Sequence, residues 1–82
     1  MDDARKIEIA DISVIMSTKG GRKFVNRVLD QCGVFSDTFC TDTHEHAKVA
    51  GRRQIGLWLV NELTEATPGE YIQLLRERLD DE

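Results

Sequence analysis

The segment 51–75, GRRQIGLWLVNELTEATPGEYIQLL, constrains the fold more than any other part of this chain. Apolar residues between Ile55 and Leu63 lie nearly all round a helical wheel, and such a helix is usually buried in the centre of a domain. Thr67 then suits an N-cap, with Pro68 at N1 and Glu70 at N3 in a capping box. The segment therefore predicts a central helix followed directly by another helix, and it contains no catalytic motif.

Four helices are predicted, over about 3–17, 19–32, 43–66 and 68–79. Asp2 or Asp3 suits the N-cap of the first helix, and Ser17 or Thr18 that of the second. Gly33 suits the left-handed position that ends the second helix. Because short links favour antiparallel neighbours, we expect residues 1–82 to form one all-α domain, a compact bundle of four helices with the third in the centre.

The apolar faces of these helices differ in clarity. The apolar face of the first helix is diffuse, because Ile7 and Val14 lie away from the side that Ile12 and Met16 share. The second has the clearest stripe, made of Phe24, Val25, Val28, Leu29 and Cys32. The expected inner face of the fourth is Tyr71, Ile72, Leu75 and Leu79. Gly51 and Gly56 weaken the third helix, and we interpret each as a point where another helix crosses closely.

The composition fits a small domain with a thin core. The chain has 82 residues, of which 40% are hydrophobic and 32% charged. A domain of this size is marginally stable, so binding a partner or self-association is an easy way to bury more surface. The net charge of −4 is uneven, at +3 over residues 17–53 and −5 over 54–82. This dipolar field could orient a partner, or it could simply reflect solvated helix faces.

No secretory signal is expected, and no apolar run approaches the ~20 residues of a membrane span. We therefore expect a soluble cytoplasmic protein whose two cysteines are thiols. A zinc site is conceivable from Cys32, Cys40, His44 and His46, but their C-x7-C-x3-H-x-H spacing lacks the close cysteine pair of structural zinc modules. Nothing in the sequence orients His44 as a base for Cys40. We predict no metal, no cofactor and no enzymatic activity.

A basic stretch at the start of the second helix is a weak candidate for binding phosphate or DNA backbone. Free N–H groups at a helix start cooperate there with cationic side chains. The net negative charge and the spacing of the two glycines argue against this site, so nucleic acid is an unlikely partner. Reversing Arg22 and Arg27 to glutamate is expected to leave the fold intact. The candidate residues are Lys19, Arg22, Lys23 and Arg27.

The stronger candidate is a protein-binding surface on the third helix. Trp58 is either a core residue or an interface anchor, because tryptophan and arginine dominate binding hot spots. Arg52 either faces a partner or bridges helix ends through an acid such as Asp30 or Glu62. The candidate residues are Arg52, Arg53, Leu57, Trp58 and Val60.

The chain also carries a spaced pattern that resembles a known family. It comprises Met16-Ser17-Thr18, Gly21-Arg22, Phe24-Val25, Arg27, Leu29, Gly33-Val34-Phe35, Gly51-Arg52, Ile55-Gly56-Leu57, Leu59, Leu63, Pro68, Tyr71 and Leu74 or Leu75. This pattern is similar to a family of small proteins of tailed bacteriophages, mostly short-tailed, whose genes often lie near those for portal, capsid and DNA-packaging proteins. The resemblance implies a phage origin and a link to particle assembly, and it implies no catalytic or binding residue.

Together these observations predict a non-enzymatic, protein-binding accessory of virion assembly or structure. Its partner would be a phage structural or packaging protein, and a homo-oligomer is also conceivable. Its location would be the host cytoplasm or the virion. The alternative is an inhibitor of a host enzyme or defence complex, since a small acidic protein can compete for a basic surface.

Overall fold

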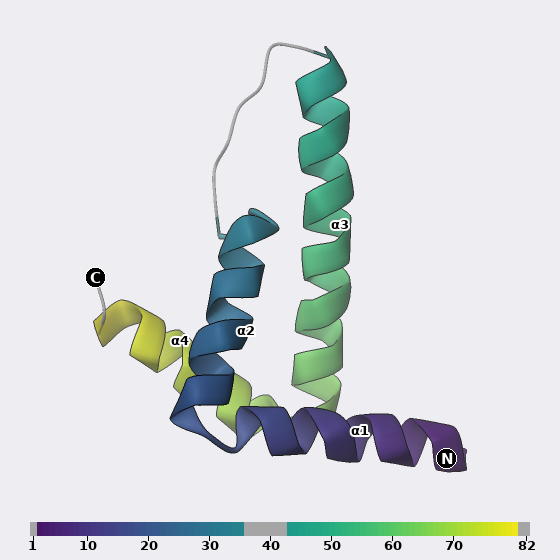
Figure 1. Cartoon of the computed structure of the whole chain (residues 1–82), viewed down its shortest axis with the longest axis vertical. Coiled ribbons are helices and arrows are strands. Elements are labelled where there is room, and N and C mark those ends of the chain that lie inside the picture. The colour runs from purple at the N-terminus through teal and green to yellow at the C-terminus, as the bar shows by residue number, and fades with distance from the viewer. Residues whose placement is uncertain (1, 36–42, 81–82) are drawn as a thin grey trace.

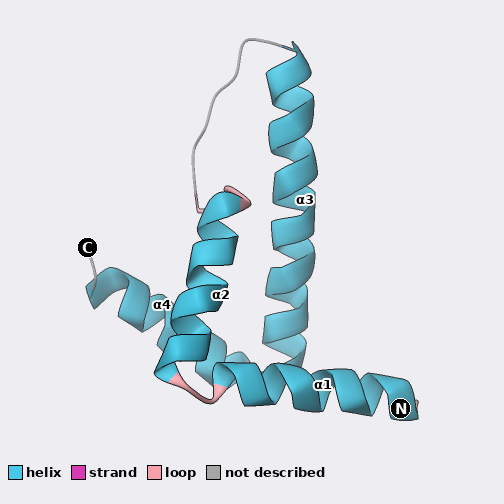
Figure 2. Cartoon of the chain, viewed as in Figure 1, coloured by secondary structure: helices cyan, strands magenta, loops and turns pink. Residues whose placement is uncertain are grey.

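A computed structural model describes the backbone of residues 2–35 and 43–80, and the side chains of 2–35 and 47–80. Four helices follow one another along the chain: α1 (Asp3–Met16), α2 (Lys19–Gln31), α3 (Thr43–Ala66) and α4 (Pro68–Asp80) (Figures 1 and 2). The predicted all-α class and the four predicted helices are confirmed, with each described helix end within one residue of its predicted position.

The helices are arranged in a flat, L-shaped molecule. α2 and α3 lie side by side and antiparallel, while α1 runs across the base of α3 and away from it (Figure 1). α4 packs against both α2 and α3. The Cα atoms extend over 42 × 34 × 15 Å, with a radius of gyration of 14.3 Å. A globular chain of 82 residues would have a radius of about 12 Å, and the predicted compact bundle of four helices forms, with a flatter outline than a sphere.

α3 makes more contacts with the other helices than any other element, as its predicted central position requires. The buried core consists of five side chains contributed by all four helices. Ile12, Val34, Leu59, Val60, Tyr71 and Leu75 pack around it and are partly buried. The core members are Met16, Val25, Leu29, Leu63 and Leu74.

Local signals in the sequence place the helix ends. The Asp2 carboxylate accepts a hydrogen bond from the Ala4 N–H at 2.7 Å, and the Thr18 hydroxyl accepts one from the Gly21 N–H at 3.0 Å. Both side chains satisfy N–H groups that a helix start leaves without an intrahelical acceptor. Gly33 has a φ of +71°, so α2 ends at the predicted left-handed glycine.

Two expected apolar faces differ from the structure. On α2, Val25 and Leu29 are buried as predicted, but Phe24 is 60% exposed. On α4, Leu74 is fully buried, whereas Ile72 and Leu79 are 52% and 70% exposed. The buried side of α4 is therefore rotated toward Leu74, because α2 and α3 contact the helix on that side and nothing in the described chain covers the other.

The two glycines within α3 have different surroundings. A Cβ added at Gly56 would overlap the side chain of Val34 and lie 2.7 Å from the Cβ of Cys32, which confirms the predicted close crossing. The close crossing predicted at Gly51 is not found among the described helices, because no described atom lies within 4 Å of a Cβ added there. The N-terminal part of α3 extends beyond the end of α2 (Figure 1), and Gly51 precedes the crossing with α2 at Gly56.

Thr67 alone separates α3 from α4. Its side chain is buried, and its hydroxyl donates to the Leu63 carbonyl at 3.2 Å. The Tyr71 N–H donates to the Thr67 carbonyl at 2.9 Å, and this hydrogen bond begins α4. The predicted capping box with Glu70 is therefore replaced by a hydrogen bond back to the preceding helix.

Candidate functional site

Trp58 lies on the surface of α3 and is 59% exposed. The interpretation of this residue as part of the core is wrong. The other helices contact α3 along the side that carries Gly56, Leu59 and Leu63, and Trp58 projects from a different side. In a flat arrangement, a helix that is apolar nearly all round must leave part of its apolar surface uncovered.

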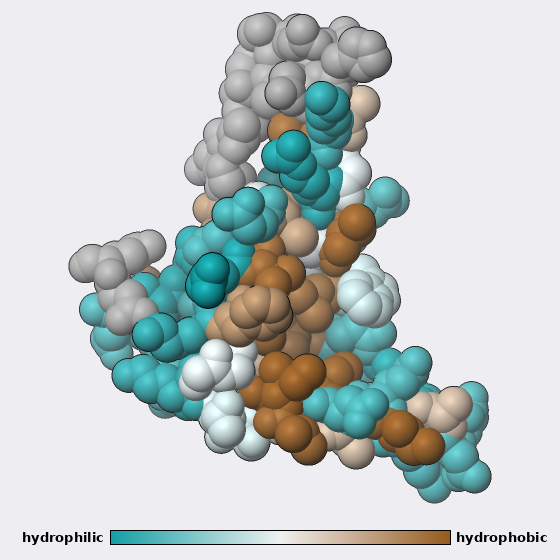
Figure 3. All heavy atoms as spheres, viewed as in Figure 1, coloured by the Kyte–Doolittle hydropathy of each residue, from teal (hydrophilic) through white to brown (hydrophobic). Residues whose placement is uncertain are grey.

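The other predicted protein-binding residues divide between the core and the surface. Val60 is partly buried against the core, and Leu57 is 46% exposed. Arg52 and Arg53 are exposed on the part of α3 that precedes the crossing with α2. Figure 3 shows apolar side chains gathered where α1, α2 and the middle of α3 meet on one face of the molecule.

The predicted bridge from Arg52 to Asp30 or Glu62 does not form. Both acids are paired, but with other arginines. Arg78 lies 2.6 Å from Asp30, and Arg5 lies 2.5 Å from Glu62. Arg52 has no ion pair among the residues that the structure describes.

Arg5 holds α1 against α3 at the inner angle of the L. Its guanidinium lies 2.5 Å from Glu62, 2.9 Å from Glu65 and 3.3 Å from Glu8. The contact with Glu62, followed by those with Glu65 and Glu8, raises the pKa of Arg5. Arg5 is not among the predicted site residues, although its i, i+3 spacing from Glu8 on a predicted helix is a local signal.

We call this inner angle the corner. It is a shallow hollow in which acids outnumber the single cation Arg5, and Trp58 forms one wall. Asp11 from α1 and the acids that surround Arg5 give it a negative charge. The lining residues are Arg5, Glu8, Asp11, Ile12, Trp58, Leu59 and Glu62.

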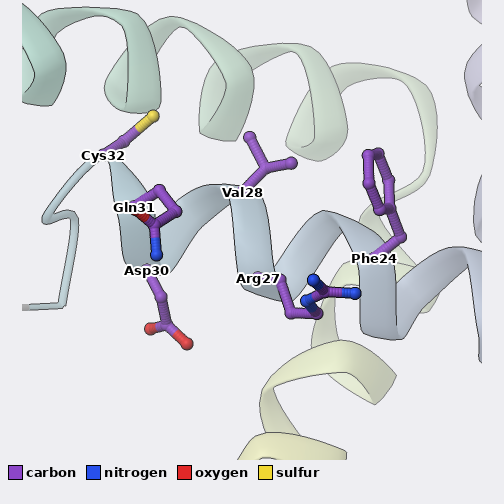
Figure 4. A pocket seen from close by; sticks show the side chains of 6 residues that line it. All are labelled: Phe24, Arg27, Val28, Asp30, Gln31 and Cys32. Atoms are coloured by element: carbon purple, nitrogen blue, oxygen red, sulfur yellow. The ribbon is translucent and has the colours of Figure 1, made fainter.

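A second hollow follows α2. Phe24, Val28 and Cys32 reach from α2 toward α3, whereas Arg27 and Asp30 point away from α3 (Figure 4). The Cys32 thiol is free and partly buried, close to Gly56 on α3. The exposed ring of Phe24 and the cation of Arg27 thus lie on neighbouring parts of one surface.

One residue of the predicted anion-binding set, Arg22, has a structural role. The Arg22 guanidinium donates to both carboxylate oxygens of Glu77, at 2.7 and 3.3 Å, and to the Met16 carbonyl at 2.9 Å. The hydrogen bonds with Glu77 raise the pKa of Arg22 and lower that of Glu77. Lys19, Lys23 and Arg27 remain exposed, so the expectation that Arg22 could be reversed without harm to the fold loses its basis.

Arg78 fastens the end of α2 to α4. Besides its ion pair with Asp30, it donates to the Asn26 side chain at 3.2 Å and lies over the Phe35 ring, 4.1 Å from the ring centre. Cation–π contacts of this kind stabilise exposed surfaces modestly. No pattern in the sequence identified Arg78, since its partners lie far away along the chain.

The conceivable metal ligands Cys40, His44 and His46 lie outside the side chains that the structure describes. Within the described residues, no group of three His, Cys, Asp or Glu side chains could hold a metal ion. None of the described helices has the length and apolar character needed to cross a membrane.

Residues 13–76, from the last turn of α1 to the third turn of α4, match the sequence pattern of Bbp19-like phage proteins. The chain belongs to the Bbp19-like phage protein family. The predicted phage origin is confirmed at this level. Comparison with curated proteins and with solved structures finds no match.

The fold explains many residues of the spaced pattern that resembles a phage protein family. Met16, Val25 and Leu29 are core residues of this Bbp19-like chain, and Gly21 lies against the Ile15 carbonyl. Other positions of the pattern have exposed side chains that contribute no buried contact. They include Phe24, Arg27, Arg52 and Leu57.

Proposed function

We propose that this Bbp19-like phage protein is a non-enzymatic protein-binding module, accessory to virion assembly or structure. The observation that carries the proposal is the exposure of Leu57 and Trp58, at 46% and 59%. Consecutive residues of a helix project about 100° apart. The middle of α3 therefore offers apolar surface over a wide arc, and no described residue of the chain covers it.

The residues near Leu57 and Trp58 suit a protein partner. Ile55 is 62% exposed, and the exposed Arg52 and Arg53 lie one to two turns earlier on α3. Contiguous apolar patches are uncommon on monomeric proteins and mark interaction sites when they occur. Tryptophan and arginine are the residues whose truncation most often weakens an interface.

The favoured partner is a phage structural or packaging protein, such as a portal or capsid subunit. Membership of a phage family supports this choice, together with the resemblance to proteins encoded near assembly genes. The alternative, an acidic inhibitor of a host protein, has less support because Glu62, Glu65 and Glu77 are already paired with arginines. The DNA-backbone alternative is weakened in the same way by the pairing of Arg22.

Site-specific crosslinking in infected cells tests the proposal. A photoreactive phenylalanine derivative would replace Leu57 in one variant and Trp58 in another, with the exposed Gln73 on α4 as the matched control position. We expect position 57 or 58, but not 73, to capture one phage structural or packaging protein. Capture of a host protein instead would support the inhibitor, and the absence of any crosslink to another protein would overturn both forms of the proposal.

A further inference from the structure

We propose that copies of this chain associate head to tail, with the outer side of α1 of one copy seated on the apolar face that α1, α2 and α3 form in the next. This inference goes beyond the proposed function, because it assigns a further surface and a second copy as its occupant. It rests on the proposed function only in treating exposed apolar surface as an interface. It leaves Leu57, which projects from another side of α3, to a different protein.

The receiving surface, which we call the front face, is the apolar area that Figure 3 shows where three helices meet. Phe24 and Val28 reach from α2 toward α3 (Figure 4). Gly21, one turn before Phe24, lies against the carbonyl of Ile15 at the end of α1. The exposed apolar side chains of α2 and α1 are therefore neighbours, and Phe24 and Ile15 are 60% and 48% exposed.

α3 continues the front face toward the corner. Leu59 and Ile12 line the corner together, so α3 and α1 meet there. Ile55 lies one turn before Leu59 and thus on the same side of α3, where it is 62% exposed. Trp58 stands at the edge of this face. The front face comprises Ile12, Ile15, Phe24, Val28, Ile55 and Leu59.

Cations border the front face where α2 and α3 form it. Arg27 lines the hollow beside Phe24, and Arg52 lies one turn before Ile55. Neither arginine forms an ion pair with a residue that the structure describes. Asp30, the one acid of α2, is paired with Arg78, and residues 47–61 contain three cations and no acid. This border therefore favours an acidic occupant.

The outer side of α1 is an amphipathic strip that no other described part of the chain covers. Ile7 and Val14 are two turns apart on the same side of the helix, and they are 63% and 71% exposed. Ala10, between them, is also exposed. Asp3 and Asp11 belong to no ion pair among the described residues. The outer strip comprises Asp3, Ile7, Ala10, Asp11 and Val14, with Lys6 along its other edge.

The outer strip and the front face complement each other. The strip is apolar with two acids and one cation, whereas the face is apolar with a basic border. An amphipathic helix binds an apolar groove through residues spaced by three or four positions, as Ile7, Ala10 and Val14 are. Opposite charges at the edges then fix the orientation and exclude other partners.

The two complementary surfaces must come from different copies. α1 packs on α3 through the side that carries Arg5 and Ile12, so its outer strip points away from the front face of its own chain. Every copy carries both surfaces, and a second copy therefore supplies the occupant of each. Because the contact joins two different patches, it is heterologous.

Light scattering on the purified chain across a concentration series tests this association with one variant for each surface. Val14→Lys places a cation on the outer strip, and Ile55→Glu places an acid on the front face. Since like charges then oppose each other, we expect either change alone to raise the dissociation constant at least about tenfold. The matched control Leu79→Lys alters a side chain on α4 that is 70% exposed and should leave the association unchanged. Circular dichroism checks that all three variants keep their helices, as the exposure of these positions predicts.

Mixing the two variants distinguishes a heterologous contact from other arrangements. Val14→Lys retains an intact front face and Ile55→Glu an intact outer strip, so we expect the mixture to form heterodimers although each variant alone is monomeric. A mixture that stays monomeric would overturn the proposal. Loss of association in Ile55→Glu but not in Val14→Lys would also overturn it, because something other than α1 would then cover the front face.

A wild-type chain that stays monomeric at every concentration would overturn the association, whatever else the chain binds. The failure of the proposed function is distinguishable from this result. A monomer that crosslinks from position 57 to a phage protein refutes only the association. A chain that associates with itself but captures no other protein refutes only the accessory role.

Discussion

At the scale of single residues, the contacts that hold this fold divide into local and long-range ones. The caps at Asp2 and Thr18 and the left-handed Gly33 depend on neighbours within three residues, and the sequence predicts them correctly. The ion pairs of Arg5 and Arg22 join residues more than 50 positions apart. Nothing in the spacing of charged residues distinguishes such a pair from a solvated cation, so these contacts emerge only from the fold.

The pair of Arg22 with Glu77 predicts a pH dependence of stability. The folded state lowers the pKa of Glu77 from its ordinary value of 4.5. The stabilisation is therefore fully present above about pH 4.5 and is lost as the pH falls through the lowered value. We expect Glu77→Gln to lower the melting temperature at pH 7, and this difference from the wild type to shrink as the pH is lowered below about 4.5. A difference that stays the same down to the lowest pH at which the chain is folded would contradict the ion pair.

The adjacent glycines at the start of α2 predict opposite effects of the same substitution. A Cβ at Gly21 would overlap the Ile15 carbonyl, which is backbone and cannot move aside, whereas a Cβ at Gly20 meets nothing within 4 Å. We expect Gly21→Ala to lower the free energy of unfolding by about 1–3 kcal/mol. Gly20→Ala should be neutral or slightly stabilising. Urea denaturation of the two variants compares them directly, and similar results for both would refute the close approach.

At the scale of helices, periodicity predicts where the elements lie better than which side they bury. Apolar residues on α4 span about 160° of its circumference, so the pattern favours a face centred near Leu75, whereas the buried face is centred on Leu74. The choice is made by the positions of α2 and α3, which are tertiary information. The same holds for Trp58, whose apolar surroundings in sequence indicate burial while the fold exposes it.

The rotated face of α4 gives a matched pair of substitutions. Leu74 is fully buried and Leu79 is 70% exposed. We expect Leu74→Ala to cost about 2–5 kcal/mol, since it leaves a cavity in a core of few side chains. Leu79→Ala should change the free energy of unfolding by less than about 0.5 kcal/mol. Thermal or urea denaturation provides the measurement, and a larger loss from Leu79→Ala would place the buried side where periodicity alone puts it.

At the scale of the whole molecule, the sequence predicts the fold class, the number of helices and the location of a candidate binding surface on α3. It does not predict the flat L shape. That shape depends on α1 crossing the base of α3, which the contacts of Arg5 with Glu62 and Glu65 help to hold. The corner is lined by residues of both α1 and α3 and exists only because of this crossing. The pattern of neither helix alone therefore predicts it.

The central claim is that α3 presents an apolar surface which another protein chain covers, and Trp58 reports on it directly. It is the only tryptophan in the chain, so its fluorescence is unambiguous. Emission and iodide quenching would be measured from dilute to concentrated protein. The account predicts solvent-exposed emission with strong quenching at high dilution, then a blue shift with protection as the chain associates. A tryptophan that is protected even in the dilute monomer, or one that stays exposed at every concentration and within assembled phage particles, would contradict the account.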